Sequence, residues 1–194
     1  MGWPVAALLG SAALGLSLAG GLAWFLRDPA RRPPAGPRAI LAPADGRVLV
    51  VERAVAPAFV AGPAWRIVTF LSIWDVHVQR APDAGRVRLS ERQAGGFALA
   101  FAAKAANNYG HQLGLETERG RVLVLRTAGL LARRVTTTVA LGQQLKAGDR
   151  IGRILLGSRV ELFVPANVVV RVRPGDRVRA GETVLANWDD DGHP

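Results

Sequence analysis

The hydrophobic positions of the chain begin with one unbroken run, which extends from Val5 to Leu26 and contains no charged residue. As a helix, a run of this length crosses a hydrocarbon core of about 30 Å. Trp3 and Trp24 lie near its two ends, where aromatic side chains favour the headgroup region. The pattern therefore predicts an N-terminal apolar membrane helix over residues 1–26. Its many Gly, Ala and Ser residues leave a shallow, in-plane arrangement open.

Positive charge follows this run directly, at Arg27, Arg31 and Arg32. The positive-inside rule then predicts that the rest of the chain lies at the cytoplasmic face of the cell (inner) membrane, held peripherally or by this single anchor. A signal peptide normally carries its positive charge before the apolar run, so a cleaved signal is the weaker interpretation. Prolines exclude helix from residues 27–38, which we expect to form an extended linker along the membrane surface. A plain solvated linker is the alternative.

From residue 39 to residue 194 the pattern changes to short β-rich runs separated by Gly, Asp and Pro turns. Many short strands of this kind predict a sandwich or partly closed barrel with few helices. Helix is expected only in the apolar start and in the Ala-rich stretch Phe97–Asn107. The expected strands are Arg47–Val51, Arg66–Ser72, Arg86–Ser90, Arg121–Arg126, Arg134–Ala140, Ile151–Leu156, Arg159–Val164 and Val168–Val172.

A short turn sequence occurs twice near the C-terminus. Lys146–Ile151 and Arg173–Val178 share Gly-Asp-Arg followed by a β-branched residue. Together with Ala180–Leu185 they resemble the hairpins of barrel-sandwich hybrid folds, which biotinyl and lipoyl carriers also use. No lysine stands at a hairpin tip to carry a prosthetic group, so a carrier function is disfavoured. The predicted fold class is therefore mainly β, a barrel-sandwich-hybrid-like body behind one apolar helix.

The amino-acid composition excludes several kinds of chemistry and several classes of partner. The 194 residues include no cysteine and three histidines, which excludes disulfides and thiolate chemistry and makes a metal site improbable on donor count. The formal net charge is +10, almost all of it from arginine, which favours an anionic partner. Because the arginines are dispersed and only 6% of residues are aromatic, a nucleic-acid partner is poorly supported. An anionic lipid or acidic substrate fits better.

One short sequence stands between two apolar runs, Leu156-Gly157-Ser158-Arg159. Glycine allows the backbone to bend so that a serine hydroxyl can reach the preceding carbonyl. Taken alone, however, Gly-Ser is an ordinary pair for a hairpin turn. The residues around it decide between these interpretations.

This sequence, followed by Val160–Pro165, resembles the maturation site of phosphatidylserine decarboxylases, specifically the short bacterial and archaeal type with Gly-Ser-Arg. Four further blocks agree with that family in order and spacing. They are the aromatic-Arg-Asp-Pro block at Phe25–Pro29, the Pro-Ala-Asp-Gly block at Pro43–Val48, the Asp-Val-His block at Leu71–Pro82 and the Ala-Gly-x-x-Ala-Arg-Arg block at Ala128–Arg134.

This chain departs from the family pattern at two places, and residue roles known for the family cannot be assigned there. The family usually has Ala-Ser-x-x-Asn-Glu-Arg-Asn after the position of Lys104, whereas this chain has Ala105–Gln112 without the Glu-Arg-Asn. Long members also carry a second histidine where this chain has Arg80. Roles assigned to that second histidine therefore do not apply here.

The resemblance implies self-cleavage between Gly157 and Ser158. Ser158 would attack the Gly157 carbonyl and become a covalent pyruvoyl cofactor, leaving a large subunit 1–157 and a small subunit 158–194 as a heterodimer. His77 is the expected acid or base, because an imidazole titrates near neutral pH. It closes an apolar β run, and Asp75, two residues earlier, is expected on the same face of that strand. Asp45 is expected to orient or deprotonate groups in maturation. The weaker candidates for binding the lipid phosphate or carboxylate are Arg80, Arg133, Arg134 and Arg159.

The implied reaction converts phosphatidylserine in an anionic membrane to phosphatidylethanolamine and carbon dioxide, in phospholipid biosynthesis. Two alternatives stay open. One keeps the chemistry but uses an archaetidylserine-type ether lipid, and the other is a non-catalytic membrane-anchored barrel-sandwich module. Higher oligomers are also open. His193, in an Asp-rich tail, is expected to have no role.

Overall fold

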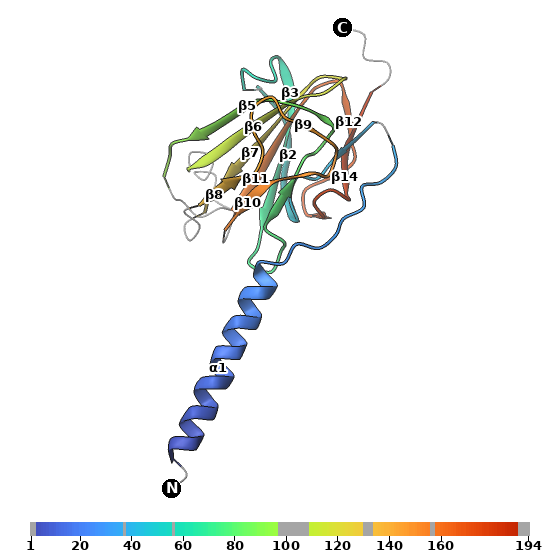
Figure 1. The fold of residues 1–194 in the computed structure, drawn as a ribbon. Helices are drawn as coiled ribbons and strands as arrows, with labels where there is room; N and C mark the ends of the chain where they lie inside the picture. Colours follow the sequence, from blue (N-terminus) through green and yellow to red (C-terminus); the bar gives the residue numbers. More distant parts are fainter. Residues whose placement is uncertain are drawn as a thin grey trace.

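The computed structural model describes residues 3–36, 38–55, 57–96, 109–129, 134–155 and 158–189. One long helix projects from one end of a body built of β-strands (Figure 1). This helix, α1, spans Trp3–Phe25. Its segment Ala7–Phe25 is long and apolar enough to cross a membrane, and none of it is buried against the body. The predicted N-terminal apolar helix and mainly β body are both confirmed.

The described strands form three antiparallel sheets. The main sheet has eight strands in the order β13-β2-β3-β11-β7-β6-β5-β9, and two sheets of three strands have the orders β1-β14-β12 and β4-β10-β8. The strands are β1 (Ala39–Leu41), β2 (Gly46–Val55), β3 (Pro63–Leu71), β4 (Val78–Arg80), β5 (Gly85–Gln93), β6 (Gly110–Glu116), β7 (Arg121–Thr127), β8 (Val135–Thr137), β9 (Gln144–Leu145), β10 (Arg150–Ile154), β11 (Ser158–Pro165), β12 (Val168–Val170), β13 (Arg177–Val178) and β14 (Val184–Trp188).

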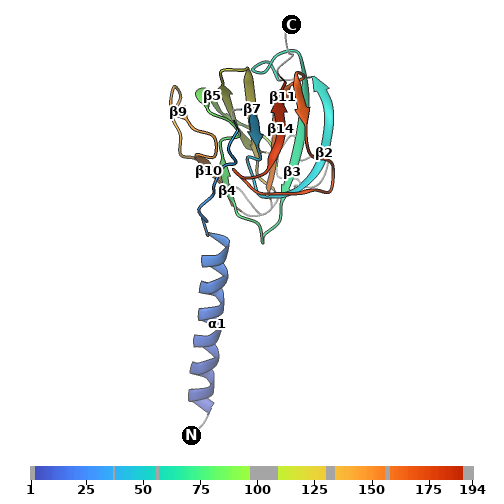
Figure 2. The same cartoon turned by 90° about the vertical axis from the view of Figure 1, so that its right-hand side faces the viewer.

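Strand β11 is central to this architecture. It pairs with β3 on one side and β7 on the other, so its backbone groups bond within the sheet. Both of its faces are buried, because Val160 and Leu162 join the larger core cluster while Phe163 joins a smaller one on the opposite face. The curved main sheet and the smaller sheets enclose the larger cluster (Figure 2). The first residue of this buried strand is Ser158.

Each expected strand overlaps an observed strand, although the one expected over Arg134–Ala140 is limited to Val135–Thr137. Six observed strands were not among those expected, namely β1, β4, β6, β9, β13 and β14. The helix expected over Phe97–Asn107 lies outside the described residues. The repeated Gly-Asp-Arg turn is real, since Asp149 and Asp176 each accept a hydrogen bond from the backbone N–H three residues earlier, at 2.8 and 2.9 Å.

The connection through Gly157 and Ser158 differs from the hairpin that the sequence suggested. Strands β10 and β11 belong to different sheets, because β10 pairs with β4 and β8. The chain therefore crosses from a small sheet to the main sheet between Ile154 and Ser158. A connection of this kind is not restrained by a shared ladder between its two flanking strands.

Candidate active site

The strand register brings the three predicted catalytic positions to one edge of the β body. Ser158 pairs with Leu71 at the end of β3, and Asp45 immediately precedes β2, which pairs with the other side of β3. His77 immediately precedes β4, and its backbone carbonyl accepts a hydrogen bond from Ile154 at 3.2 Å. Phe25, the last residue of α1, packs on the His77 ring with centroids 4.4 Å apart. This edge is therefore the one from which α1 emerges. Gly157 lies outside the described residues.

The His77 side chain is only 1% exposed, and one of its ring nitrogens has no partner among the described residues. Nδ1 lies 2.8 Å from the Asp75 backbone carbonyl, and Nε2 is the buried nitrogen that no described residue contacts by a hydrogen bond. Burial lowers the pKa of His77, so the ring is neutral near pH 7. A neutral ring that donates from Nδ1 to a carbonyl leaves Nε2 as an acceptor with a free lone pair. This is the electronic state of a general base.

Asp75 does not have the relation to His77 that the sequence suggested. Both were expected on one face of a strand, but neither lies in a strand, since β4 begins at Val78. The Asp75 carboxylate instead accepts hydrogen bonds from the backbone N–H and hydroxyl of Ser72, at 2.8 and 2.7 Å. It therefore closes the loop before His77, while its backbone carbonyl orients the ring.

The Asp45 carboxylate is buried and fully engaged. Oδ1 accepts a hydrogen bond from the Ala180 backbone N–H at 2.7 Å, and Oδ2 pairs with Arg31 at 2.7 Å. Burial raises the pKa of Asp45, and the Arg31 charge acts against that rise. Arg31 also pairs with Glu182 at 2.9 Å. Among the described residues, no hydrogen bond joins Asp45 to His77.

These contacts correct the expectation for the linker. Its arginines were expected to face headgroups or solvent, but the Arg31 side chain is only 8% exposed. Asp28 also holds the linker to the body, pairing with Arg80 at 3.0 Å and Arg150 at 2.5 Å. The linker is therefore part of the folded body, and through Arg31 it forms the surroundings of Asp45.

The four arginines suggested for substrate binding have different environments. Arg80 is 7% exposed and pairs with Asp28, and Arg159 is 4% exposed and pairs with Glu161 at 2.7 Å. Both charges are thus already balanced by carboxylates within the fold. Arg134 is exposed, and Arg133 lies outside the described residues.

A buried guanidinium near this edge was missed by sequence reasoning. Arg126 is 0% exposed, and burial lowers its pKa to about 10. Its Nη2 lies 2.8 Å from Nδ1 of His111, whose pKa is lowered to about 4, so the imidazole is neutral and accepts this hydrogen bond. In the part of the chain that the structure describes, no carboxylate pairs with Arg126. Since it faces Val160 across the ladder, position 158 is its diagonal neighbour, about 7–8 Å away.

The same guanidinium joins the main sheet to the small sheet β4-β10-β8. It donates to the backbone carbonyls of Thr136 and Ile151 at 3.0 and 3.1 Å and to the Thr137 hydroxyl at 2.7 Å. Gly152 makes the approach possible, because a Cβ there would lie 2.3 Å from Arg126 Nη1. Arg126 therefore fixes β10 relative to β7, the neighbour of β11, and so restrains both ends of the Ile154–Ser158 crossing.

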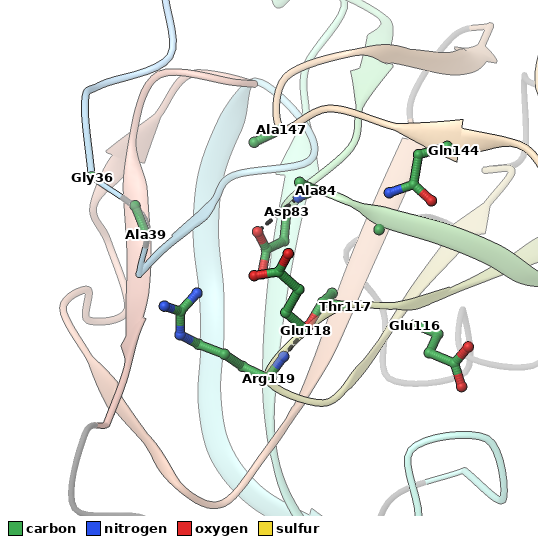
Figure 3. Close-up of a pocket in the computed structure, with 11 residues that line it drawn as sticks. Gly36, Ala39, Asp83, Ala84, Glu116, Thr117, Glu118, Arg119, Gln144 and Ala147 are labelled. Carbon is green, nitrogen blue, oxygen red and sulfur yellow. Dashed lines mark hydrogen bonds between the residues drawn. The ribbon is translucent and has the colours of Figure 1, made fainter.

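Two cavities of the described surface have very different linings. One, of about 600 Å³, has Asp83 and Glu118 among the residues that line it (Figure 3). Asp83 is engaged by the Trp188 indole N–H at 2.8 Å, and none of the predicted site residues lines this cavity. The other is an apolar groove of about 950 Å³ between the end of α1 and the loop before His77. Only the second adjoins the predicted catalytic residues.

Comparison with known proteins assigns the family. The family model for phosphatidylserine decarboxylase matches residues 18–186, nearly the whole chain. The chain belongs to the phosphatidylserine decarboxylase family, which is a family of enzymes.

Individual relatives agree with this assignment. A protein of Symbiobacterium thermophilum named phosphatidylserine decarboxylase proenzyme is 44% identical, over 95% of this chain and 92% of the relative. Proteins with the same name from Saccharopolyspora erythraea and Chlorobium luteolum are 43% and 39% identical, over 91% and 85% of this chain and 77% and 78% of their own lengths.

Proposed function

We propose that this chain is the precursor of a pyruvoyl-dependent enzyme that decarboxylates phosphatidylserine to phosphatidylethanolamine and carbon dioxide. The observation that carries the proposal is the buried, unpaired Nε2 of His77, at the edge where β11 begins with Ser158. A buried nitrogen without a partner costs a fold about 1–3 kcal/mol, and a catalytic role is one reason for a protein to keep such a group. The name shared by the relatives, a decarboxylase proenzyme, supports the same chemistry.

Maturation would use groups of this chain alone. The Ser158 hydroxyl attacks the Gly157 carbonyl carbon, the peptide C–N bond breaks, and an ester replaces the amide. Removal of the Ser158 Cα proton then expels the Gly157 carboxylate and leaves a dehydroalanine, which water converts to a terminal ketone and ammonia. His77 Nε2 is suited to accept a proton in these steps because its ring is neutral.

The ketone derived from Ser158 would supply an electron sink for the electron pair left as carbon dioxide departs. The residues around position 158 suit such a group, since His77 has a free lone pair and Arg126 adds an unbalanced positive charge. His77, once protonated, would return its proton to the substrate carbon. Asp45, held by Arg31, would orient groups during cleavage.

The strand order supports a stable heterodimer after cleavage. Segment 158–194 would contribute β11, which pairs on both sides with strands of segment 1–157, and β14, which pairs with β1. Backbone ladders of this extent, with both faces of β11 buried, hold two chains together without a covalent link. We further propose that α1 anchors the enzyme at the cytoplasmic face of the inner membrane, where Arg27 follows the apolar run.

The test is carbon dioxide release by the purified protein from vesicles that contain phosphatidylserine labelled at the carboxyl carbon. We expect release from the wild type and none from Ser158→Ala, which has no hydroxyl to form a ketone. Borohydride, which reduces a ketone, should also abolish release. Wild-type protein that releases nothing from diacyl or ether-linked serine lipids would support the non-catalytic module instead.

A further inference from the structure

The apolar groove beside the candidate site is built from two separate parts of the chain. One wall is the last turns of α1, and the other is the loop before His77 together with Leu155. Its lining is almost entirely apolar, and Trp74 is 71% exposed there. Because α1 is apolar enough to cross a membrane, a groove along its end opens towards acyl chains.

Two arginines lie at the rim of this groove. Arg27 donates from Nη1 to the Trp24 carbonyl at 2.8 Å and from Nη2 to the Trp74 carbonyl at 2.6 Å, with its guanidinium 4.1 Å from the centre of the Trp24 ring. Arg153 donates from Nη1 to the Leu26 carbonyl at 2.9 Å. All three acceptors belong to residues that line the groove.

Neither of these arginines pairs with a carboxylate among the described residues, in contrast to Arg31 and Arg80. Their contacts with neutral carbonyls use two of the five N–H donors of Arg27 and one of those of Arg153. Two unbalanced guanidinium groups at the mouth of an apolar groove fit a ligand with an apolar tail and an anionic head. A phospholipid has this composition, with its phosphate between the two.

We propose that Arg27 and Arg153 bind the phosphate of the phospholipid substrate while an acyl chain occupies the groove lined by Trp24, Trp74 and Leu155. This inference rests on the proposed function and adds the subsite that holds the substrate. It also replaces Arg80 and Arg159, whose charges are balanced within the fold, as the phosphate ligands.

The proposed subsite has a direct path to the catalytic edge. Arg153 pairs in the β-ladder with Val78, the residue after His77, and Phe25 joins the groove wall to the His77 ring. Burial is the main cause of the lowered pKa of His77, and the charges of Arg27 and Arg153 lower it further, which agrees with both lying near the ring. A phosphate held at the rim would therefore present the serine part of the headgroup towards His77.

The first test measures binding without turnover. Full-length Ser158→Ala protein in detergent micelles is titrated with dihexanoyl phosphatidylserine, and the dissociation constant is compared with that of Arg27→Gln and Arg153→Gln in the same background. We expect each change to weaken binding about tenfold, which corresponds to about 1.4 kcal/mol. Arg27→Lys and Arg153→Lys should recover part of the loss, because they retain the charge but not the planar fork.

Arg53→Gln is the matched control. Arg53 is exposed near the far end of β2, about 23 Å along the strand from Gly46. Its substitution by glutamine removes the same charge as the two test variants. We expect binding within twofold of the unmodified background. If Arg27→Gln and Arg153→Gln also remain within twofold, the phosphate assignment is wrong, whatever the activity of the wild type.

A second comparison separates the lipid from its headgroup. Glycerophosphoserine carries the same phosphate without acyl chains, so Trp74→Ala should weaken binding of the dihexanoyl lipid several-fold and leave glycerophosphoserine unchanged. The Arg27 hydrogen bond uses the Trp74 backbone carbonyl, which Trp74→Ala retains. Equal effects on both ligands would overturn the acyl-chain assignment. Wild-type protein that binds the lipid as expected but neither cleaves nor releases carbon dioxide would refute the proposed function and leave a lipid-binding site.

Discussion

Arg31→Met is the change that most directly tests the role of the linker in the candidate site. The wild-type guanidinium lies 2.7 Å from Asp45 and 2.9 Å from Glu182, with the Asp45 side chain 11% exposed and that of Glu182 30% exposed. Methionine keeps much of the side-chain volume but removes both ion pairs. Asp45 would then keep the Ala180 N–H as its hydrogen-bond partner. We expect a loss of about 3 kcal/mol in unfolding free energy at pH 7, mostly from Asp45 because Glu182 is better solvated.

The loss should depend on pH in a defined direction. Burial raises the pKa of Asp45 in the fold above its ordinary value of 3.8, so the folded state binds this proton more readily than the unfolded chain. The stability associated with Asp45 therefore decreases as the pH rises from 3.8 through the folded pKa. Arg31→Met raises that pKa further, so its deficit is greatest at pH 7 and shrinks to about 1 kcal/mol on acidification, as Asp45 is protonated.

The assay is urea unfolding of the uncleaved Ser158→Ala protein in detergent micelles, followed by tryptophan fluorescence at pH 7 and pH 4.5. Arg173→Met is the matched control, because the Arg173 side chain is 88% exposed and 3.7 Å from Asp176. Its effect should stay below about 0.5 kcal/mol at both pH values. A deficit for Arg31→Met that equals the control, or that grows on acidification, would refute the structural role assigned to the Arg31–Asp45 pair.

Three further predictions follow from the site. His77→Ala should reduce carbon dioxide release, normalised to ketone content, far more than His193→Ala, and near wild-type release by His77→Ala would show that another group moves the proton. Because the pKa of His77 is lowered, wild-type activity should persist below pH 6.5. Gly152→Ala should destabilise the fold by about 3 kcal/mol, because the alanine Cβ would lie 2.0 Å from the Thr136 carbonyl oxygen and because residue 152 has a φ of +148°. An unchanged urea midpoint would contradict this. Deleting residues 1–23, which keeps Phe25, should leave cleavage largely intact but lower activity on vesicles relative to soluble short-chain lipid, and failure to cleave would make α1 part of the fold.

The fold could be predicted where the hydrophobic pattern was strong. The strands over Arg66–Ser72 and Arg159–Val164 were predicted close to their observed bounds, because β-branched and aromatic residues fill them. Strand β6 was missed because glycines weaken its pattern. Gly114 is nevertheless required there, since a Cβ would lie 2.5 Å from the Phe59 ring, a contact that no local pattern reveals.

The candidate site could be predicted only in part, for a similar reason. Asp45 and His77 belong to short blocks that are recognisable within the sequence, and the structure brings both to the edge where Ser158 begins β11. Arg31 and Arg126 belong to no such block. Arg31 lies in a linker whose composition suits a membrane surface, and Arg126 is one of many arginines in β-rich runs. Their burial depends on partners distant in the chain, which only the three-dimensional fold brings together.

The most direct test of the central claim is the intact mass of the purified wild-type protein beside that of Ser158→Ala. We expect two wild-type chains, residues 1–157 and 158–194, the second starting with a ketone in place of an amino group. For Ser158→Ala we expect a single uncleaved chain of 20.6 kDa. A wild type that stays whole, a break at another bond, or cleavage of Ser158→Ala would contradict the central claim.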